Sequence, residues 1–166
     1  MPGVVRPTLF RSSPHENGGG FLIDGGSHLL CELLWCTQSR IEFVTAQMDQ
    51  AAFDLRAVLT MTLGNGVMAT LSQAADSRVR DKRRCSLYFG SEAMAEITGV
   101  PFEVLLRKGV AGDGQVIESA REQNLPPAPT PVGDFIDCVR EGNERAPLLD
   151  NDLAIHIVEV IAAADA

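Results

Sequence analysis

Hydrophobic residues recur at a helical spacing near the start of the chain, directly after a glycine-dense segment. Gly18, Gly19 and Gly20 precede a short apolar stretch, and further glycines follow it before Ser27. Four leucines then fall on one face of a helix: Leu29, Leu30, Leu33 and Leu34. This three-to-four spacing predicts a helix that has Ser27 as its N-cap and ends near Thr37 or Gln38.

The middle of the chain alternates with period two, which is typical of strands. The expected strands cover residues 41–48, 55–63, 67–75, 85–89, 93–98 and 102–107. Gly64-Asn65-Gly66 separates the second strand from the third, and Asn-Gly is a preferred hairpin turn. Successive strands joined by short turns predict an antiparallel meander rather than a parallel sheet with helical crossovers.

The last third of the chain is predicted to be a connector followed by two helices. Residues 109–131 are opened by glycines and closed by prolines, so we expect irregular structure there. The first helix has one apolar face and ends at Gly142; that face holds Val132, Phe135, Ile136 and Val139. The final helix starts at Asp150 or Asn151, with His156 at a partly exposed position and a buried stripe of Leu153, Ile157, Val160 and Ile161.

These elements predict an α+β fold in which helices pack on one face of an open, mostly antiparallel twisted sheet. The length of 166 residues fits a single domain. No apolar run approaches the roughly 20 residues that a membrane helix needs, so we expect a soluble protein that does not enter a membrane. The net charge of −8 argues against nucleic acid as a partner, because phosphate binding needs a basic surface.

The four cysteines have no spacing typical of a zinc site, so we expect no metal. Their arrangement is also unlike that of a secreted disulfide scaffold, and the N-terminus has no signal pattern, so reduced thiols and a cytoplasmic location are expected.

Asp24 and His28 are the strongest candidates for chemistry. They are four residues apart, which places them on one face if the helix begins early enough. A neutral imidazole can accept a proton, and a carboxylate can hold its tautomer and stabilise the imidazolium. A capping Asp and a hydrogen-bonded structural His fit the same spacing.

Two further segments have both a functional and an ordinary explanation. Residues 64–69 fit the dinucleotide pattern G-x-G-x-x-A, but that pattern needs a strand before it and a helix after it, whereas a strand follows here. We therefore expect a hairpin and no cofactor-binding residues. The basic run from Arg78 to Arg84 could bind a phosphate or an acidic partner, or be a solvated loop.

The segment Gly18 to Glu32 resembles the signature of the C-terminal domain of Gfo/Idh/MocA oxidoreductases, which include glucose–fructose oxidoreductase and inositol dehydrogenase. The family pattern is a glycine run, an Asp, a Gly, a His and an acidic residue one turn later. Here these fall on the glycines 18–20, Asp24, Gly26, His28 and Glu32. The stretches 9–16, 59–71, 87–97, 131–142 and 150–164 are also similar to the family, so the resemblance runs from about residue 9 to the end.

The resemblance implies that His28 matches the catalytic acid/base and Asp24 its acidic companion. It also implies NAD or NADP for a full-length relative and a sugar- or polyol-like substrate. The family's N-terminal Rossmann domain is expected to be absent. Its Glu-Lys-Pro motif, which carries the catalytic Lys, is expected to be absent too, because neither Lys82 nor Lys108 is preceded by Glu or followed by Pro. We therefore expect a domain that is inactive alone and binds no cofactor by itself.

Such a domain could be a fragment of a longer enzyme. As a separate protein it could pair with a Rossmann subunit, bind a small molecule without turnover, or form a homo-oligomer through the outer face of its sheet. The residues expected on that face are mild and uncharged: Val58, Thr60, Thr62, Met68, Thr70 and Ser72.

Overall fold

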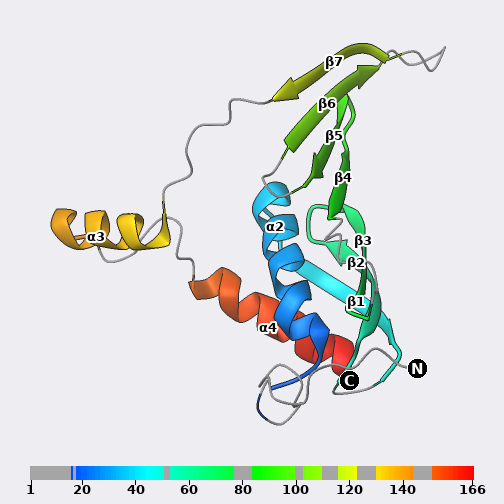
Figure 1. The fold of residues 1–166 in the computed structure, drawn as a ribbon, viewed down its shortest axis with the longest axis vertical. Coiled ribbons are helices and arrows are strands. Elements are labelled where there is room, and N and C mark those ends of the chain that lie inside the picture. The colour runs from blue at the N-terminus through cyan, green and yellow to red at the C-terminus, as the bar shows by residue number, and fades with distance from the viewer. Residues whose placement is uncertain are drawn as a thin grey trace. The chain divides into compact units, whose positions relative to one another are not determined.

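The fold was analysed in a computed structural model. It describes Glu16 and residues 18–50, 53–76, 84–99, 103–109, 116–122, 130–143 and 151–166. In chain order the elements are η2 (Leu22–Gly26), α2 (Ser27–Thr37), β1 (Ile41–Met48), β2 (Arg56–Leu63), β3 (Met68–Ala74), β4 (Cys85–Phe89), β5 (Ala93–Thr98), β6 (Glu103–Gly109), β7 (Val116–Glu122), α3 (Pro131–Glu141) and α4 (Asn151–Asp165) (Figure 1). The fold is α+β, as the sequence predicts.

The helix predicted from Ser27 is present, but Ser27 does not cap it. A single π-helical turn, η2, runs directly into α2, so the residue before Ser27 is already helical. The Ser27 hydroxyl instead donates a hydrogen bond to the carbonyl oxygen of Asp24, at 3.3 Å. The helix ends at Thr37, because Gln38 adopts a left-handed conformation with φ of 50°.

Strands β1, β2 and β3 form an antiparallel sheet with β2 in the centre. Thr60 on β2 lies opposite Thr45 on β1 and Thr70 on β3. The turn between β2 and β3 is the predicted Asn-Gly hairpin: the Gly66 amide donates to the Leu63 carbonyl, and Gly66 has a φ of +83°. Glycine is favoured here because an L side chain is strained at positive φ.

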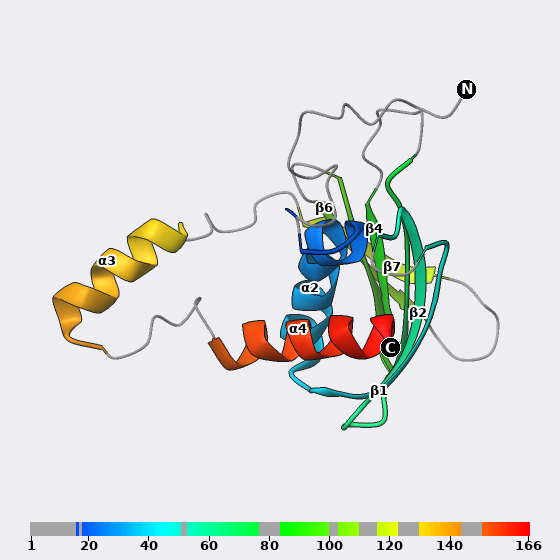
Figure 2. The ribbon, with the colours of Figure 1, turned by 90° about the horizontal axis from the view of Figure 1, so that it is seen from below.

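Helices α2 and α4 cover one face of this sheet (Figure 2). On β2 every second side chain is buried, and these are Ala57, Leu59, Met61 and Leu63. Val58 and Thr60, which point the other way, are exposed. The alternation of buried and exposed residues on β2 therefore arises because one face of the sheet packs against helices and the other face is exposed in this chain.

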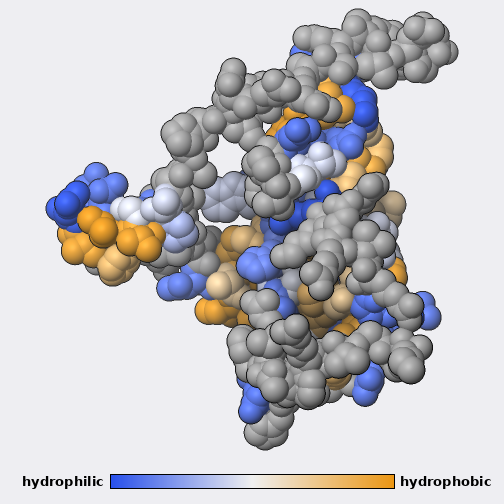
Figure 3. All heavy atoms as spheres, in the orientation of Figure 1, coloured by the Kyte–Doolittle hydropathy of each residue, from blue (hydrophilic) through white to orange (hydrophobic). Residues whose placement is uncertain are grey.

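Helix α3 has the predicted amphipathic pattern, and its apolar side is exposed. Figure 3 shows orange side chains along one edge of this helix and blue ones on the other. The exposed apolar residues are those expected from the sequence: Val132, Phe135, Ile136 and Val139. The helix ends at Glu141, and Gly142 directly after it has a φ of +69°, which suits glycine.

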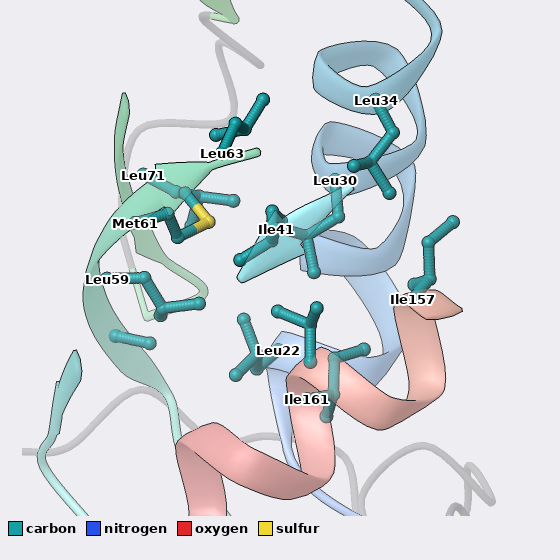
Figure 4. Close-up of a cluster of buried hydrophobic side chains, with 12 residues drawn as sticks. Leu22, Leu30, Leu34, Ile41, Leu59, Met61, Leu63, Leu71, Ile157 and Ile161 are labelled. Atoms are coloured by element: carbon teal, nitrogen blue, oxygen red, sulfur yellow. The ribbon is translucent and has the colours of Figure 1, made fainter. Parts of the chain in front are cut away.

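The hydrophobic core lies between the sheet and the two helices (Figure 4). Its largest fully buried side chains come from η2, α2 and β2, and are Leu22, Leu30, Leu59, Met61 and Leu63. From α4 the residues Ile157, Val160 and Ile161 are buried as predicted, and Leu153 packs at the margin.

His156 is buried, so the expectation that it is partly exposed is wrong. Its Nε2 accepts a hydrogen bond from the Ile41 amide at 3.0 Å. The other ring nitrogen, Nδ1, lies 2.9 Å from Arg40 Nη2 and 3.1 Å from Glu159 Oε2. Arg40 pairs with the same carboxylate at 3.1 Å. A helix-period pattern cannot reveal this role, because the partner amide comes from β1.

By their contacts the residues divide into two compact units, Met1–Arg78 with Pro131–Ala166, and Val79–Thr130. The second unit holds an antiparallel sheet of β4, β5, β6 and β7 in that order. Strand β7 lies within the segment predicted to be an irregular connector, so that prediction is wrong. β7 pairs with β6 along its whole length: Val104 lies opposite Glu122 at one end, and Gly109 lies opposite Val116 at the other. This backbone pairing, and not an alternation of apolar side chains, makes the segment a strand.

Candidate functional site

The glycine-dense segment is held in place by Asp54, which lies in the loop between β1 and β2. The Asp54 carbonyl accepts a hydrogen bond from the Phe21 amide at 2.8 Å. Its carboxylate accepts one from the Leu22 amide, with distances of 3.0 and 3.2 Å to the two oxygens. These amides start the helical segment and have no partner within it, so Asp54 acts as an N-cap supplied from a distant part of the chain.

Gly20 allows this close approach. A Cβ at position 20 would lie 2.1 Å from Asp54 Oδ1 and 2.2 Å from the Asp54 backbone nitrogen. Asp54 is only 2% exposed, so it has little room to move away. The glycine is therefore required by packing against Asp54.

Two more glycines permit tight packing inside the π-helical turn. A Cβ at Gly25 would lie 2.6 Å from the Phe21 ring, and one at Gly26 would lie 2.6 Å from a Leu22 methyl group and 2.9 Å from Gln73 Oε1. Single π-helical turns occur frequently at functional sites. This turn carries Asp24.

The structure places Asp24 and His28 about one helical turn apart, at the junction of η2 and α2. Asp24 is half-buried, whereas His28 is exposed. The core-facing residues of α2 are Leu30 and Leu34. His28 lies on the opposite side of the helix from these leucines, because consecutive residues are separated by about 100° around an α-helix. An imidazole in this position can reach a ligand in solvent.

Asp54 and Gln73 are parts of this region that the sequence did not single out. The Gln73 amide nitrogen lies 3.4 Å from Asp54 Oδ2, while its Oε1 is buried without a hydrogen-bond partner. Asp54 sits in no motif, since its partners are 32 and 33 residues earlier in the chain. The available signal was Gly20, whose missing side chain marks a close backbone approach without identifying what approaches.

A second carboxylate, Asp165 at the end of α4, interacts electrostatically with Asp54. Burial, followed by the negative charge of Asp54, raises the pKa of Asp165 above its usual value of 3.8. A negative charge at a helix C-terminus is unfavourable in addition.

Residues 64–69, which fit the dinucleotide pattern, form the β2–β3 hairpin and the start of β3. A pyrophosphate site needs the N-terminus of a helix at this point, so these residues do not fit a dinucleotide. Among the described residues no group of three His, Cys, Asp or Glu side chains could hold a metal ion. Of the basic run, Arg78 to Arg83 lie outside the described residues.

The cysteines at 31, 36, 85 and 138 are unpaired thiols. Within the described ranges, no helix combines the length and the apolar character needed to cross a membrane.

The chain is similar to known proteins in both sequence and structure. The sequence profile of the GFO/IDH/MocA C-terminal domain matches residues 2–96. No curated protein sequence matches the chain.

Solved structures share the fold at low sequence identity. The NAD-binding protein from Listeria innocua is 21% identical, with a TM-score of 0.65, over 90% of this chain and 49% of that one. Aldose-aldose oxidoreductase from Caulobacter crescentus, complexed with glycerol, is 19% identical with a TM-score of 0.71, over 95% and 48%. The WlbA dehydrogenase from Bordetella pertussis, in complex with NADH and UDP-GlcNAcA, is 16% identical with a TM-score of 0.62, over 89% and 43%.

The chain thus spans about half the length of the solved structures that it matches. The profile match covers more than half of the chain and includes the glycine-dense segment, Asp24 and His28. On these grounds the chain belongs to the GFO/IDH/MocA C-terminal domain family.

Proposed function

We propose that this chain supplies the substrate-binding half of an NAD(P)-dependent oxidoreductase that acts on a sugar- or polyol-like molecule, and that it is inactive without a cofactor-binding Rossmann domain. The observation that carries the proposal is an exposed His28 on the outward face of α2, one turn after a half-buried Asp24, within the family's glycine-dense segment. The matching structures are described as NAD-binding, aldose-aldose oxidoreductase and NADH-complexed dehydrogenase.

In this proposal His28 acts as the general base that accepts the proton of the substrate hydroxyl. When a secondary alcohol becomes a carbonyl, the hydroxyl proton has to leave, and a neutral imidazole within hydrogen-bond reach accepts it. Asp24, one helical turn before His28, is its acidic companion in this proposal. The carboxylate of Asp54 contributes indirectly, because it fixes the backbone turn from which Asp24 projects.

The nicotinamide cofactor, which supplies the redox chemistry in such enzymes, has to be held elsewhere. The dinucleotide-like residues 64–69 form a hairpin, and α2 begins in a π-helical turn whose first amides are already occupied by Asp54. The described residues therefore do not fit a dinucleotide-binding site. A Rossmann domain in a longer protein or in a separate subunit is the source that the family membership supports.

The first test is a titration of the chain with NADH and NADPH, followed by nicotinamide fluorescence. The proposal expects no saturable binding. Saturable binding would mean that the chain forms its own dinucleotide site and would contradict the need for a second domain.

The second test is turnover in a complex reconstituted with a Rossmann partner. Replacing His28 by Asn should lower kcat about 10²–10⁴-fold, the usual contribution of a general acid/base, while the circular dichroism spectrum stays unchanged. Cys36→Ser is the matched control, because Cys36 is also exposed on α2. Unchanged turnover in the His28 variant would refute its role.

A second candidate function is an oligomerisation module, and the outer face of the β1–β2–β3 sheet favours it. Val58 is 48% exposed and Met68 is 82% exposed, and the six residues expected on this face carry no charge. Two copies of a chain with a net charge of −8 repel one another, so an uncharged face is where they can approach. We propose a second copy of this chain as the occupant.

Light scattering tests this candidate. The wild-type chain should form a dimer that Thr60→Lys dissociates, because position 60 lies at the centre of the face and the substitution places like charges opposite each other. Asn65→Lys, in the β2–β3 turn, is the control and should leave the dimer intact. A monomeric wild-type chain at high concentration would exclude this role.

A further inference from the structure

One buried titratable side chain takes no part in the proposed function. His156 lies on α4 and is 6% exposed. Helix α4 packs against β1 on the helix-covered face of the sheet (Figure 2). Histidine is the side chain whose charge ordinarily changes between about pH 5 and 8. A buried histidine that joins two elements can therefore make their contact depend on pH.

The hydrogen bond at Nε2 of His156 requires a lone pair on that nitrogen. The amide of Ile41, the first residue of β1, donates to Nε2 at 3.0 Å. A backbone N–H can only donate, and an imidazolium carries a proton on both nitrogens, so a protonated ring cannot accept this bond. Ile41 is 7% exposed, so water does not readily replace the imidazole as the acceptor. The bond therefore exists only while the ring is neutral.

Two side chains of opposite charge face the other ring nitrogen. Arg40 Nη2 lies 2.9 Å from Nδ1, and Glu159 Oε2 lies 3.1 Å from it. The same two groups form an ion pair with each other at 3.1 Å. Arg40 disfavours a positive ring and Glu159 favours one, so their effects oppose each other. Both contacts are at Nδ1, so neither group supplies a new acceptor for the Ile41 amide.

The other charged residues of α4 and of the elements packed against it are acidic at neutral pH. Elements η2, α2 and β1 pack against α4. The acidic residues of these four elements besides Glu159 are Asp24, Glu32, Glu42, Asp152 and Asp165. Their charges favour a positive ring, but solvent and salt screen such an effect. The bond from Ile41 is direct and buried, so we expect it to decide the direction of the pH dependence.

We propose that His156 is a pH-sensitive switch in the contact between α4 and β1. The neutral ring holds the Ile41 amide, and uptake of one proton from solvent by the Nε2 lone pair breaks that hydrogen bond. The attachment of α4 to the sheet therefore weakens as the pH falls from about 7.5 to about 5.5. This inference is independent of the proposed function, because it uses no residue of the candidate site.

Urea unfolding of the whole chain at about pH 7.5 and about pH 5.5 tests the proposal, with His156→Gln as the reference. Glutamine offers an oxygen acceptor that does not titrate, so the comparison cancels the effects of all other titrating groups. Between these pH values the folding equilibrium constant of the wild type should fall about three- to tenfold more than that of the variant. Tenfold is about the limit for one ring that takes up its proton only in the unfolded chain, where imidazole titrates near pH 6.5.

Two further variants assign the effect to the bond at Nε2. His28→Gln is the matched control, because His28 is exposed on α2, and it should keep the pH dependence of the wild type. Glu159→Gln removes the carboxylate that favours a positive ring, so its pH dependence should be at least as large as that of the wild type. A dependence that disappears in either variant would refute the proposal.

An NMR titration of the folded wild type gives a readout that needs no folded variant. The Ile41 amide resonance should move with the same midpoint as the His156 ring, or the ring should stay neutral until the chain unfolds. A protonated His156 ring beside an unchanged Ile41 amide would overturn the proposal.

The urea result can also overturn it in two ways. Equal pH dependence of the wild type and His156→Gln would show that the ring does not act as a switch. A wild type that gains stability relative to His156→Gln as the pH falls would show that pairing of the positive ring with Glu159 outweighs the lost bond to Ile41.

Discussion

Replacement of Asp54 by Ala tests whether a residue from the β1–β2 loop holds the glycine-dense segment in place. The substitution removes the carboxylate that accepts from the Leu22 amide, at 3.0 and 3.2 Å. It also removes the partner of the Gln73 amide nitrogen, at 3.4 Å. Leu22 is 1% exposed, so water cannot take over as the acceptor without rearrangement.

The expected loss follows from the burial of that amide. A lost N-cap typically costs about 0.5–2 kcal/mol, and a buried donor left without a partner costs about 1–3 kcal/mol. Because these describe the same bond, the upper part of the range applies and we expect about 2–3 kcal/mol. For a chain of this length the melting temperature should fall by roughly 4–12 °C.

Asp54→Asn should cost less, about 1 kcal/mol, because the amide oxygen still accepts one hydrogen bond and only the charge is lost. Asp137→Ala is the matched control: Asp137 is exposed on α3 and its ion pair with Arg140 is 3.7 Å long and open to solvent. Such exposed pairs contribute about 0–1 kcal/mol.

Urea unfolding measures the difference, with Trp35 fluorescence reporting on α2 and circular dichroism on the whole chain. The order of stability should be wild type, then Asp54→Asn, then Asp54→Ala. A loss in Asp54→Ala no larger than in Asp137→Ala would refute the reasoning, because it would show that the Leu22 amide does not depend on the carboxylate.

Three further changes have expected outcomes. His156→Leu should cost about 1–3 kcal/mol because the Ile41 amide loses its buried acceptor, and His156→Gln, which offers an oxygen, should cost less in the same urea assay. Gly20→Ala should destabilise by about 1–3 kcal/mol through overpacking against the Asp54 backbone, whereas Gly64→Ala, which meets the flexible end of Glu42, should cost less. The raised pKa of Asp165 means that its contribution to stability is present below the pKa of the unfolded chain and is lost as pH rises through the pKa of the folded chain. Asp165→Asn should therefore raise the urea midpoint at about pH 7 and change it little at about pH 3. The same gain at both pH values would contradict the assignment.

The sequence by itself determined most of the helices and strands in the described part of the chain, with the exceptions of η2 and β7. The three-to-four spacing of leucines located α2, the period-two alternation located β1 to β6, and Asn-Gly located the β2–β3 turn. The pattern of residues 18–32 also indicated the family and thereby the candidates Asp24 and His28. These features are short-range: each depends on residues within one or two turns of a helix or within one hairpin, so the pattern contains the physical cause.

Only the tertiary structure decided which distant groups meet. Asp54 caps the helical segment from across 32 residues, and His156 accepts a hydrogen bond from Ile41 across 115. Residues 116–122 form strand β7 because β6 provides hydrogen-bond partners for their backbone. The hydrogen bonds between strands also define two separate sheets, β1–β2–β3 and β4–β5–β6–β7. A buried polar group and an edge strand are stabilised by partners that the local sequence does not specify. Periodicity therefore identified which face of each element is buried, whereas the fold identified which distant residues contact one another.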